Sequence, residues 1–204
     1  MTWQPLNGLK KDPKQPRARQ TVNRIIDATA QLISELGLEG MTTNKVADRA
    51  NVNIASLYQY FPNKQVLISA LLQRQLNEVT LVLNNILNQM EDASVEDSTR
   101  MWAQLAIQYY RQKGGMMTEV LTNQYTHTTL PEVREFEHRL MEAMRRFLVK
   151  QRHRLKVSDL DLSIYIAFTS CTAVILKHLL EPVPYYSDEQ IVEELVQLMA
   201  RYFY

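Results

Sequence analysis

Apolar residues recur at spacings of three and four along almost the whole chain, which is the spacing of one face of an α-helix. The first such run extends from Val22 to Leu36 and is followed by Gly37, a residue type common at helix C-termini. The alternation of apolar and polar residues that is typical of β-strands occurs nowhere. Only five glycines and seven prolines occur in the 204 residues, a composition that also favours helices. We therefore predict an all-α protein.

Polar residues, glycines and prolines interrupt this spacing, and the interruptions mark the ends of the further helices that we expect. They run over residues 43–50, 54–61, 64–90, 99–113, 116–127, 131–153, 159–181 and 188–203. Residues 1–20 contain several prolines among charged residues, and we expect them to form a flexible basic arm.

Positive charge is concentrated toward the N-terminal end. Residues 1–64 contain nine Lys and Arg against five Asp and Glu, net +4, whereas residues 65–204 contain fourteen against seventeen, net −3. Much of the excess lies before residue 25 and includes Arg17 and Arg19. A local basic segment beside a near-neutral remainder is typical of a protein that binds a polyanion with one end. A solvated tail without a partner has the same composition.

The segment from Thr43 to Phe61 has the residue types that a helix-turn-helix requires. Two short helices that cross steeply need a small residue where they approach, and Ala47 meets this need. Four positions later the turn needs a residue that tolerates positive φ, a role suited to Asn51. Asn53 can then cap the second helix, whose first turn would enter the major groove of DNA.

The apolar side of this second helix is expected to pack inward, which leaves a polar and nearly uncharged set facing outward. Its members are Asn53, Ala55, Ser56, Tyr58, Gln59 and Tyr60. Such side chains suit base edges and phosphate oxygens, and a glutamine can bind adenine through two hydrogen bonds. Lys64, in the first turn of the next helix, can hold a phosphate together with backbone amides.

Residues 21–67 resemble the N-terminal module of the tetracycline-repressor (TetR) family of regulators. The matching features are Thr42-Thr43, Val46-Ala47, Ala50-Asn51-Val52, Leu57-Tyr58, Tyr60-Phe61 and the run from Asn63 to Leu67. Two features depart from the family pattern. Asn51 stands where glycine is common, and Ile54-Ala55 replaces a small, polar start of the second helix, which leaves the DNA sequence unpredictable.

The resemblance implies roles for individual residues. It places Tyr58, Tyr60 and Lys64 at phosphates, and Asn44, Asn53, Ala55 and Ser56 at variable base contacts. The full set of expected DNA-binding residues is Arg17, Arg19, Thr43, Asn44, Lys45, Asn53, Ala55, Ser56, Tyr58, Gln59, Tyr60 and Lys64. The expected organisation is thus the basic arm over 1–20, a three-helix helix-turn-helix domain over 21–66, and a helical bundle for ligand binding and dimerisation over 67–204.

The resemblance also implies a homodimer of nine- or ten-helix subunits in which the last two helices of each subunit form a four-helix bundle. Apolar stripes on 159–181 and 188–203 suit this role. They comprise Ile164, Phe168, Cys171, Ile175 and Leu179 in the first helix and Ile191, Leu195, Leu198 and Tyr202 in the second. The same stripes are equally compatible with an ordinary core within one chain.

Methionine and aromatic residues are concentrated in residues 99–130 and suit a pocket for an apolar or aromatic ligand. The candidate ligand-binding residues are Trp102, Tyr109, Met116, Met117, Tyr125, His127, Phe168 and Cys171. Each of them could instead be a core residue. The run of cations from Arg145 to Lys156 is open to two interpretations, a second nucleic-acid site or a solvated helix end.

The chain offers little for enzymatic chemistry. Glu135 and His138 have the spacing of a di-iron helix motif, but no second copy exists, and Cys171 has no nearby histidine. We therefore expect no catalytic residue, no metal and no cofactor. A single cysteine, no secretory signal and an apolar stretch (162–176) shorter than a membrane span predict a cytoplasmic protein without a membrane partner.

These observations predict a ligand-responsive transcriptional regulator. We expect a repressor that a small apolar or aromatic molecule releases from a near-palindromic double-stranded operator. The alternative is a helical-bundle protein that binds small molecules, or an enzyme, with an N-terminal motif that does not bind DNA.

Overall fold

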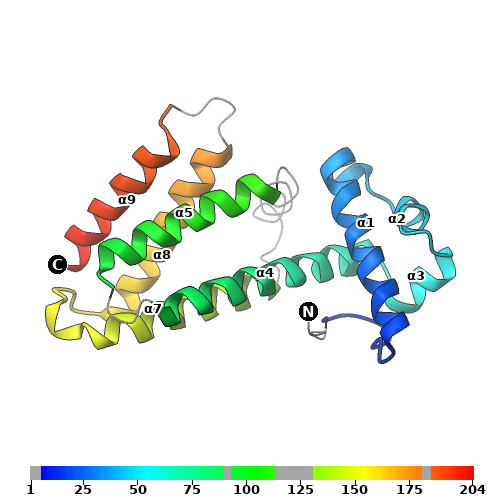
Figure 1. Ribbon diagram of the computed structural model, residues 1–204, viewed down its shortest axis with the longest axis horizontal. Coiled ribbons are helices and arrows are strands. Elements are labelled where there is room, and N and C mark those ends of the chain that lie inside the picture. Colours follow the sequence, from blue (N-terminus) through cyan, green and yellow to red (C-terminus); the bar gives the residue numbers. More distant parts are fainter. Residues whose placement is uncertain (1–5, 90–92, 114–130, 181–184) are drawn as a thin grey trace. The chain divides into compact units, whose positions relative to one another are not determined.

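The computed structural model describes residues 6–89, 93–113, 131–180 and 185–204. These residues form eight α-helices and one short 3₁₀ helix, and no strand occurs among them (Figure 1). The all-α prediction is therefore confirmed. The helix expected over 116–127 lies outside the described residues.

The chain divides into two compact units. One comprises residues 1–80 with 115–135, and the other comprises residues 81–114 with 136–204. The first division falls inside α4 (Lys64–Gln89), whereas the sequence placed a boundary after residue 66. Because α4 is a continuous helix through both positions, no loop or change of spacing marks the division in the sequence.

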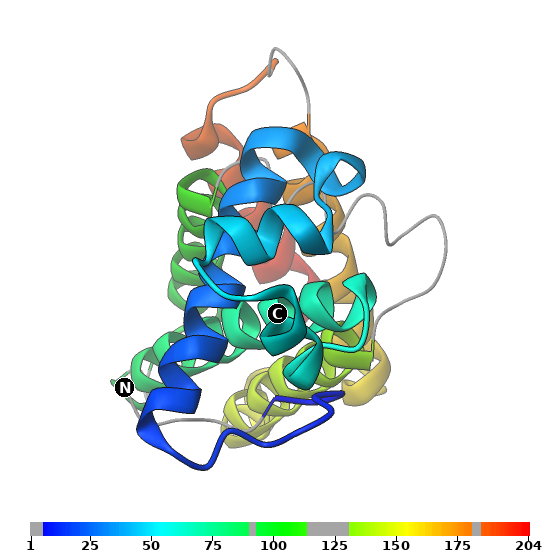
Figure 2. The ribbon, with the colours of Figure 1, turned by 90° about the vertical axis from the view of Figure 1, so that its right-hand side faces the viewer.

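The first unit is built on α1 (Pro16–Gly40), α2 (Thr43–Arg49), α3 (Ile54–Tyr60) and the first part of α4. α1 packs against α2, and α2 against α3, as the end-on view in Figure 2 shows. The spacing of apolar residues in α1 directs one face inward, and that face meets apolar residues of the short helices. The fully buried side chains include Ile25, Ile26, Ile33, Val46, Leu57, Phe61, Leu67 and Leu71.

α1 is longer than the apolar run that predicted it. It begins at Pro16, where proline is well tolerated because the first amides of a helix have no partner in the helix. It therefore includes residues 16–20, which the sequence assigned to a flexible arm. Near its other end Gly37 has φ 73°, a left-handed conformation that favours glycine, and the helix bends there before it ends at Gly40.

The residues that precede α1 contact the other helices of the first unit. The amide of Lys10 donates to the carbonyl of Tyr60 at 2.9 Å, and the amide of Asn7 donates to Oε1 of Gln73 at 2.7 Å. The Arg19 guanidinium donates through Nε to the carbonyl of Pro13 at 3.0 Å. The backbone of residues 7–13 is thus tied to α1, α3 and α4.

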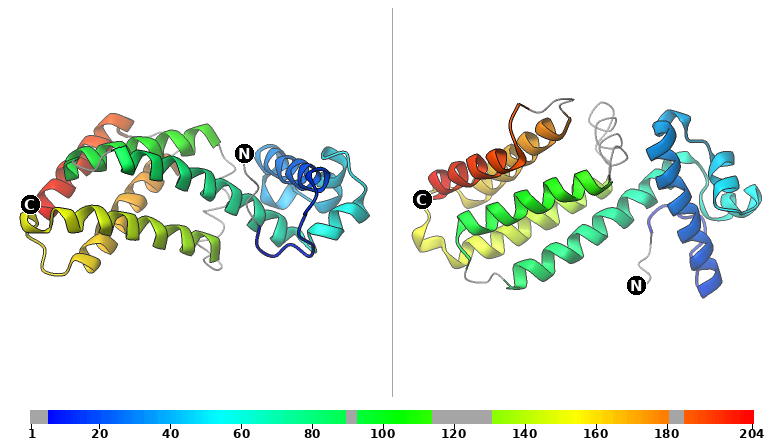
Figure 3. Two further views of the ribbon diagram at one scale, coloured as in Figure 1. Left: turned by 60° about the horizontal axis from the view of Figure 1, so that its bottom comes forward. Right: turned by 45° about the horizontal axis from the view of Figure 1, so that its top comes forward.

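The second unit contains α5 (Val95–Lys113), most of α7 (Pro131–Lys150), a 3₁₀ turn (Arg152–Arg154), α8 (Leu160–Leu180) and α9 (Asp188–Phe203). α5, α8 and α9 lie side by side, with α5 packed most extensively on α9 (Figure 3). Their shared core includes Ala103 and Ile107 of α5, Ile164 and Ile175 of α8, and Leu195, Val196 and Met199 of α9.

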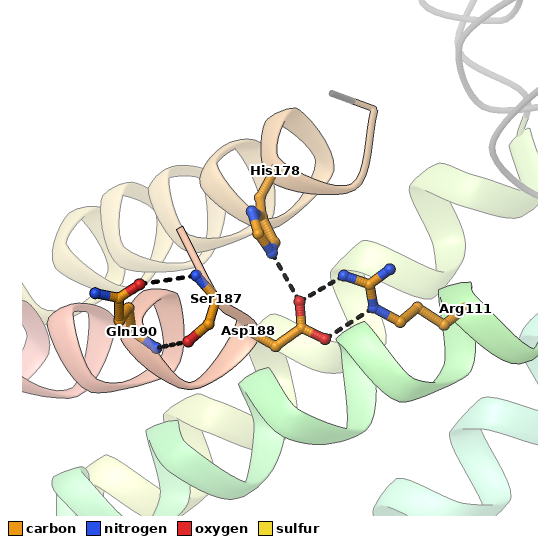
Figure 4. Close-up of polar contacts among 5 residues, drawn as sticks. All are labelled: Arg111, His178, Ser187, Asp188 and Gln190. Atoms are coloured by element: carbon orange, nitrogen blue, oxygen red, sulfur yellow. Dashed lines mark hydrogen bonds and ion pairs between the residues drawn. The ribbon is translucent and has the colours of Figure 1, made fainter. Parts of the chain in front are cut away.

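A polar cluster joins three helices of the second unit at the start of α9. Asp188 accepts two hydrogen bonds from the guanidinium of Arg111 on α5, at 2.6 and 2.8 Å, and lies 2.8 Å from Nε2 of His178 on α8 (Figure 4). The His178 side chain is only 4% exposed. Ser187 and Gln190 form a reciprocal capping box in the same turn. The hydrogen bond to Arg111, followed by that to His178, lowers the pKa of Asp188.

α8 confirms the helix predicted over 159–181, but it is less buried than expected. It has 21 residues and is long and apolar enough to cross a membrane by length and composition, whereas the sequence predicted an apolar stretch, 162–176, too short for a membrane span. Only 39% of its most apolar window is buried within the chain. Ile164, Phe168, Cys171 and Ile175 of the stripe offered for dimerisation are buried in the chain's own core, and Leu179 is partly buried against it. The exposed apolar stripe is on another face of α8.

Candidate nucleic-acid interface and ligand cavity

The turn between α2 and α3 has the predicted geometry. Asn51 has φ 51° and is the one non-glycine residue with positive φ in the described chain. Its amide donates to the carbonyl of Asp48 at 3.1 Å, and the amide of Val52 donates to the carbonyl of Ala47 at 3.0 Å. Ala47 itself is 2% exposed, as a small residue at the helix crossing should be. The prediction for both residues is confirmed.

Side-chain caps fix the start of each short helix. Oγ1 of Thr42 accepts a hydrogen bond from the amide of Lys45 at 3.3 Å. Oδ1 of Asn53 accepts from the amide of Ala55 at 2.8 Å, so Asn53 caps α3 as predicted. Oδ1 of Asn63 accepts from the amide of Val66 at 2.9 Å at the start of α4. These caps set the direction of α3 relative to α1 and α4 within the first unit.

The inner face of α3 is larger than the sequence suggested. Leu57 and Phe61 are fully buried, as predicted, and Tyr60 is buried with them at 9% exposure. The placement of Tyr60 on the outward face was therefore wrong. Residue 60 follows Leu57 by three positions, so the two side chains share one face of the helix.

The outer face of α3 is open and uncharged. Asn53, Ala55, Tyr58 and Gln59 are exposed, and Ser56 is half-buried. This face has neither a carboxylate to repel phosphates nor a cation to bind them without regard to sequence. It offers amide, hydroxyl and methyl groups, the types of group that distinguish base pairs in the major groove.

α2 contributes a polar surface next to that face. Asn44 and Lys45 are exposed and Thr43 is half-buried. Oγ1 of Thr43 and the hydroxyl of Tyr58 are 3.0 Å apart and share a hydrogen bond between α2 and α3. This contact brings the predicted residues Thr43 and Tyr58 together, and the other predicted residues of the two helices, apart from Tyr60, are exposed or half-buried.

The two lysines of the candidate interface are anchored to the C-terminal end of α1. Nζ of Lys45 donates to the carbonyl of Gly40 at 2.9 Å, and Nζ of Lys64 donates to the carbonyl of Leu38. Cations favour this position because the last carbonyls of a helix lack partners and carry partial negative charge. Each ammonium has three protons, so this contact leaves donors for a phosphate.

The basic residues of the N-terminal segment differ in their surroundings. Arg17 is exposed on the first turn of α1, whereas Arg19 is half-buried and bonded to the carbonyl of Pro13. Arg17 is thus the more accessible of the two for a polyanion.

Two ion pairs that sequence reasoning missed hold α2 and α4 on α1. The guanidinium of Arg49 donates to both carboxylate oxygens of Glu35 at 2.7 and 2.8 Å, and this hydrogen bonding lowers the pKa of Glu35. Arg74 on α4 donates to Asp27 on α1 at 2.7 Å. The partners are 14 and 47 residues apart in sequence, so no helical spacing could have identified them.

The second unit contains an apolar cavity of about 90 Å³, bounded by α5, α7, α8 and α9. The rings of Trp102 and Phe168 lie on its wall, with centroids 6.1 Å apart and planes at 58°. Cys171 adds a neutral thiol, because burial raises its pKa to about 11. The cavity wall also includes Met101, Met144, Phe147, Met199 and Phe203.

Three predicted ligand residues, Trp102, Phe168 and Cys171, line this cavity. Tyr109 does not, and its ring instead contacts that of Tyr110 at 6.1 Å. The other four candidates, Met116, Met117, Tyr125 and His127, lie outside the described residues. Sequence reasoning missed the lining residues of α7 and α9, because apolar positions in an amphipathic helix do not reveal whether they face a cavity or another side chain.

The basic run near the end of α7 has partners within its own unit. Arg145 pairs with Asp161 at 2.8 Å, and Arg146 lies 3.8 Å from Glu142. Arg152 donates to the carbonyl of Val157 at 2.9 Å. These contacts favour the interpretation of a solvated helix end.

Comparison with known proteins identifies both parts of the chain. Residues 25–71 match the family described as bacterial regulatory proteins, tetR family, and residues 94–203 match the tetracyclin repressor-like C-terminal domain. The second match alone spans more than half of the chain.

The chain is 43% identical over 56 residues to the uncharacterized HTH-type transcriptional regulator YvkB of Bacillus subtilis, covering 28% of this chain and 30% of that protein. It is 41% identical over 56 residues to the class A tetracycline repressor from transposon 1721 in Escherichia coli, covering 28% of this chain and 26% of the repressor. The matched segment thus spans less than a third of either curated relative.

A solved structure extends the likeness in fold. A TetR-family transcriptional regulator from Mesorhizobium loti superimposes with a TM-score of 0.71, covering 93% of this chain and 99% of that one, at 13% identity. At this identity the superposition demonstrates a shared fold alone. Together with the two family matches, it leads to the conclusion that the chain belongs to the tetR family of bacterial regulatory proteins.

Proposed function

We propose that the protein is a DNA-binding transcriptional repressor that acts as a homodimer and responds to a small molecule. The observation that carries this proposal is the outer face of α3. It presents Asn53, Ala55, Tyr58 and Gln59 to solvent, next to a turn that Asn51 holds in the left-handed conformation. An exposed, uncharged polar helix face on a rigid helix-turn-helix is suited to reading base edges.

We expect two kinds of contact with DNA, one to base edges and one to phosphates. Gln59 can donate to and accept from adenine. Asn53 caps α3 and Ser56 lies in its first turn, the part of the helix that would enter the groove deepest. Lys45, Lys64 and Tyr58 supply donors for phosphates at the edge of the face. We expect phosphate contacts to fix the orientation of the protein on DNA and the contacts of α3 to select the sequence.

The exposed stripe of α8 supports a homodimer. Leu162, Tyr165, Ile166 and Leu180 are 42–56% exposed, at spacings that place them along one side of the helix. Leu198 on α9 is 50% exposed. A second copy would bury this apolar surface by isologous contact, the commonest way in which soluble proteins form dimers. Two recognition helices would then meet a near-palindrome in successive major grooves, about 34–36 Å apart.

The apolar cavity is the proposed effector site. A ligand that fits the cavity better in one conformation of the dimer than in another would shift the population between them. If the favoured spacing of recognition helices does not match the operator, the ligand releases DNA. The Escherichia coli relative is a tetracycline repressor, which supports repression as the mode of action.

The test of this proposal is selection from a random duplex DNA pool with the full-length protein at moderate salt. We expect recovery of a near-palindrome whose half-sites are centred about 10 base pairs, or a multiple of this, apart. Affinity for the selected site should fall steeply with salt, because each phosphate contact releases counterions. Recovery of no sequence above background, with correctly folded protein, would overturn the proposal.

A further inference from the structure

A buried hydroxyl without a partner lies on the wall of the apolar cavity. Oγ of Ser98, the fourth residue of α5, is inaccessible to solvent and makes no hydrogen bond in the described chain. A buried hydroxyl without a partner is costly, and native structures contain few of them. This hydroxyl can donate one hydrogen bond and accept two. In its present rotamer Oγ is also out of reach of a molecule in the cavity, so a ligand satisfies it only after rotation about the Cα–Cβ bond turns the hydroxyl toward the cavity.

The remainder of the cavity wall offers no partner for a charged ligand. Among the described residues that line the cavity, none has an ionisable side chain apart from Cys171, whose thiol is neutral because its pKa is about 11. An ionised carboxylate or ammonium placed here would lose its hydration and gain no counter-ion. The wall thus favours neutral over charged ligands.

The size and shape of the cavity restrict the ligand further. Its volume of about 90 Å³ is smaller than the engineered cavity of about 150 Å³ that binds benzene. The cavity therefore has room for one ring at most, and a ring fits only if side chains on the cavity wall move. Met101 and Met144, which are flexible, can move to admit it. The inclined rings of Trp102 and Phe168 offer a face and an edge, the contacts that aromatic ligands prefer.

We propose that the cavity binds an uncharged, single-ring aromatic molecule with one hydroxyl-type polar group, and that this group hydrogen-bonds Oγ of Ser98. Simple phenols are the representative class. The inference rests on the proposed function only in treating the cavity as the effector site. It adds the charge, size and polar anchor of the ligand.

Four single-ring probes test the proposal with the full-length protein: phenol, toluene, benzoate and benzylammonium. The chain has two tryptophans, Trp3 and Trp102, so the Trp3→Phe variant makes tryptophan emission report on the cavity alone. We expect phenol to bind and to change the emission of Trp102, and the two ions to bind at least about tenfold more weakly. Binding of either ion as tight as that of phenol, or phenol binding without a change in Trp102 emission, would overturn the proposal.

Substitution of Ser98 distinguishes the contribution of its hydroxyl to ligand affinity from that of the apolar wall. Ser98→Ala should weaken the binding of phenol about two- to tenfold and leave the binding of toluene unchanged, because it removes one hydrogen bond and no apolar contact. It should not lower the unfolding temperature, since the hydroxyl has no partner in the unliganded protein. Ser170→Ala, on α8 and away from the cavity wall, is the matched control. An unchanged ratio of phenol affinity to toluene affinity in Ser98→Ala would contradict the proposed hydrogen bond to Ser98.

The same probes distinguish this inference from the proposed function. If phenol binds as expected but does not release the selected DNA, the account of the cavity stands and the ligand response of the repressor fails. If the protein selects no DNA sequence, the titration of Trp102 still decides the ligand class. If the probes fail while DNA is bound specifically, the inference alone is wrong.

Discussion

Asn51 is held at φ 51° between two short helices, a conformation that costs most residues free energy because Cβ approaches the following carbonyl. Asparagine and glycine tolerate it best, and β-branched residues tolerate it least. The direction of α3, and hence the presentation of its outer face, depends on this single backbone conformation.

Substitutions at Asn51 should follow backbone preference and not side-chain chemistry. We expect Asn51→Gly to change the free energy of unfolding by less than about 1 kcal/mol and Asn51→Val to lower it by about 1–2 kcal/mol. Denaturant unfolding of both variants measures the difference. Equal stability of the two variants would show that the turn does not require positive φ.

Tyr58 and Tyr60, two residues apart on α3, should respond in opposite ways. Tyr60→Ala removes a buried ring and should lower the free energy of unfolding by about 3–5 kcal/mol. Tyr58 is 42% exposed, so Tyr58→Ala should cost about 1 kcal/mol or less and weaken DNA binding instead. Thermal unfolding and DNA titration of the pair measure both effects. A larger loss of stability in Tyr58→Ala would contradict the assigned faces.

These residues mark the limit of prediction from sequence for the site. The turn at Asn51, the cap at Asn53 and the burial of Leu57 were predictable because each depends on local chemistry at a fixed offset. Tyr60 was not, because a seven-residue helix has too few positions to fix the edge of its apolar face, and tyrosine is compatible with either side.

At the scale of helices, contacts between distant segments fix what local spacing leaves open. Arg49 with Glu35, and Arg111 with Asp188, join helices through bidentate ion pairs. The stripe from Ile164 to Ile175 was equally compatible with a core or a dimer contact, and packing within the chain decides for the core. α8 is apolar around most of its circumference, so its sequence does not indicate which face meets α5 and α9.

The cluster at the start of α9 predicts a loss of stability in acid. The pKa of Asp188 is lowered in the folded protein, chiefly by Arg111, so its contribution is present above the unfolded value and is lost as pH falls through the folded value. We expect stability to decline below about pH 3.8, and Asp188→Asn to make this decline shallower. The free energy of unfolding, measured as a function of pH for wild type and variant, tests both expectations. The exposed neighbour Glu189→Gln is the control, and an equal effect of both variants would contradict the assignment.

At the scale of the whole molecule, the two compact units have separate chemistry. The first offers an open polar helix face, and the second offers an apolar cavity and an exposed apolar stripe. That a helix-turn-helix precedes further helices was predictable from residues 43–61, but the division inside α4 was not. The position of the cavity was not, because four helices distant in sequence form it.

The exposed stripe of α8 should govern the oligomeric state. Ile166→Glu places a charge in the proposed interface and should convert the dimer to a monomer, because a buried charge without a partner opposes association. Val149→Glu, at a similarly exposed apolar position on α7, should leave the dimer intact. Sedimentation equilibrium of the two variants measures the difference. A dimer in Ile166→Glu, or a monomer in Val149→Glu, would place the interface elsewhere.

The central claim is that the outer face of α3 reads a DNA sequence, and the specificity of Gln59→Ala tests it most directly. Affinities for the selected site and for each single base-pair variant of it should be measured for wild type, Gln59→Ala and Gln104→Ala, an exposed glutamine of the second unit. We predict that Gln59→Ala loses about 1–3 kcal/mol of discrimination at one base pair of each half-site and keeps its affinity for unrelated DNA, while Gln104→Ala behaves as wild type. An unchanged specificity profile in Gln59→Ala, or the same change in Gln104→Ala, would contradict the account.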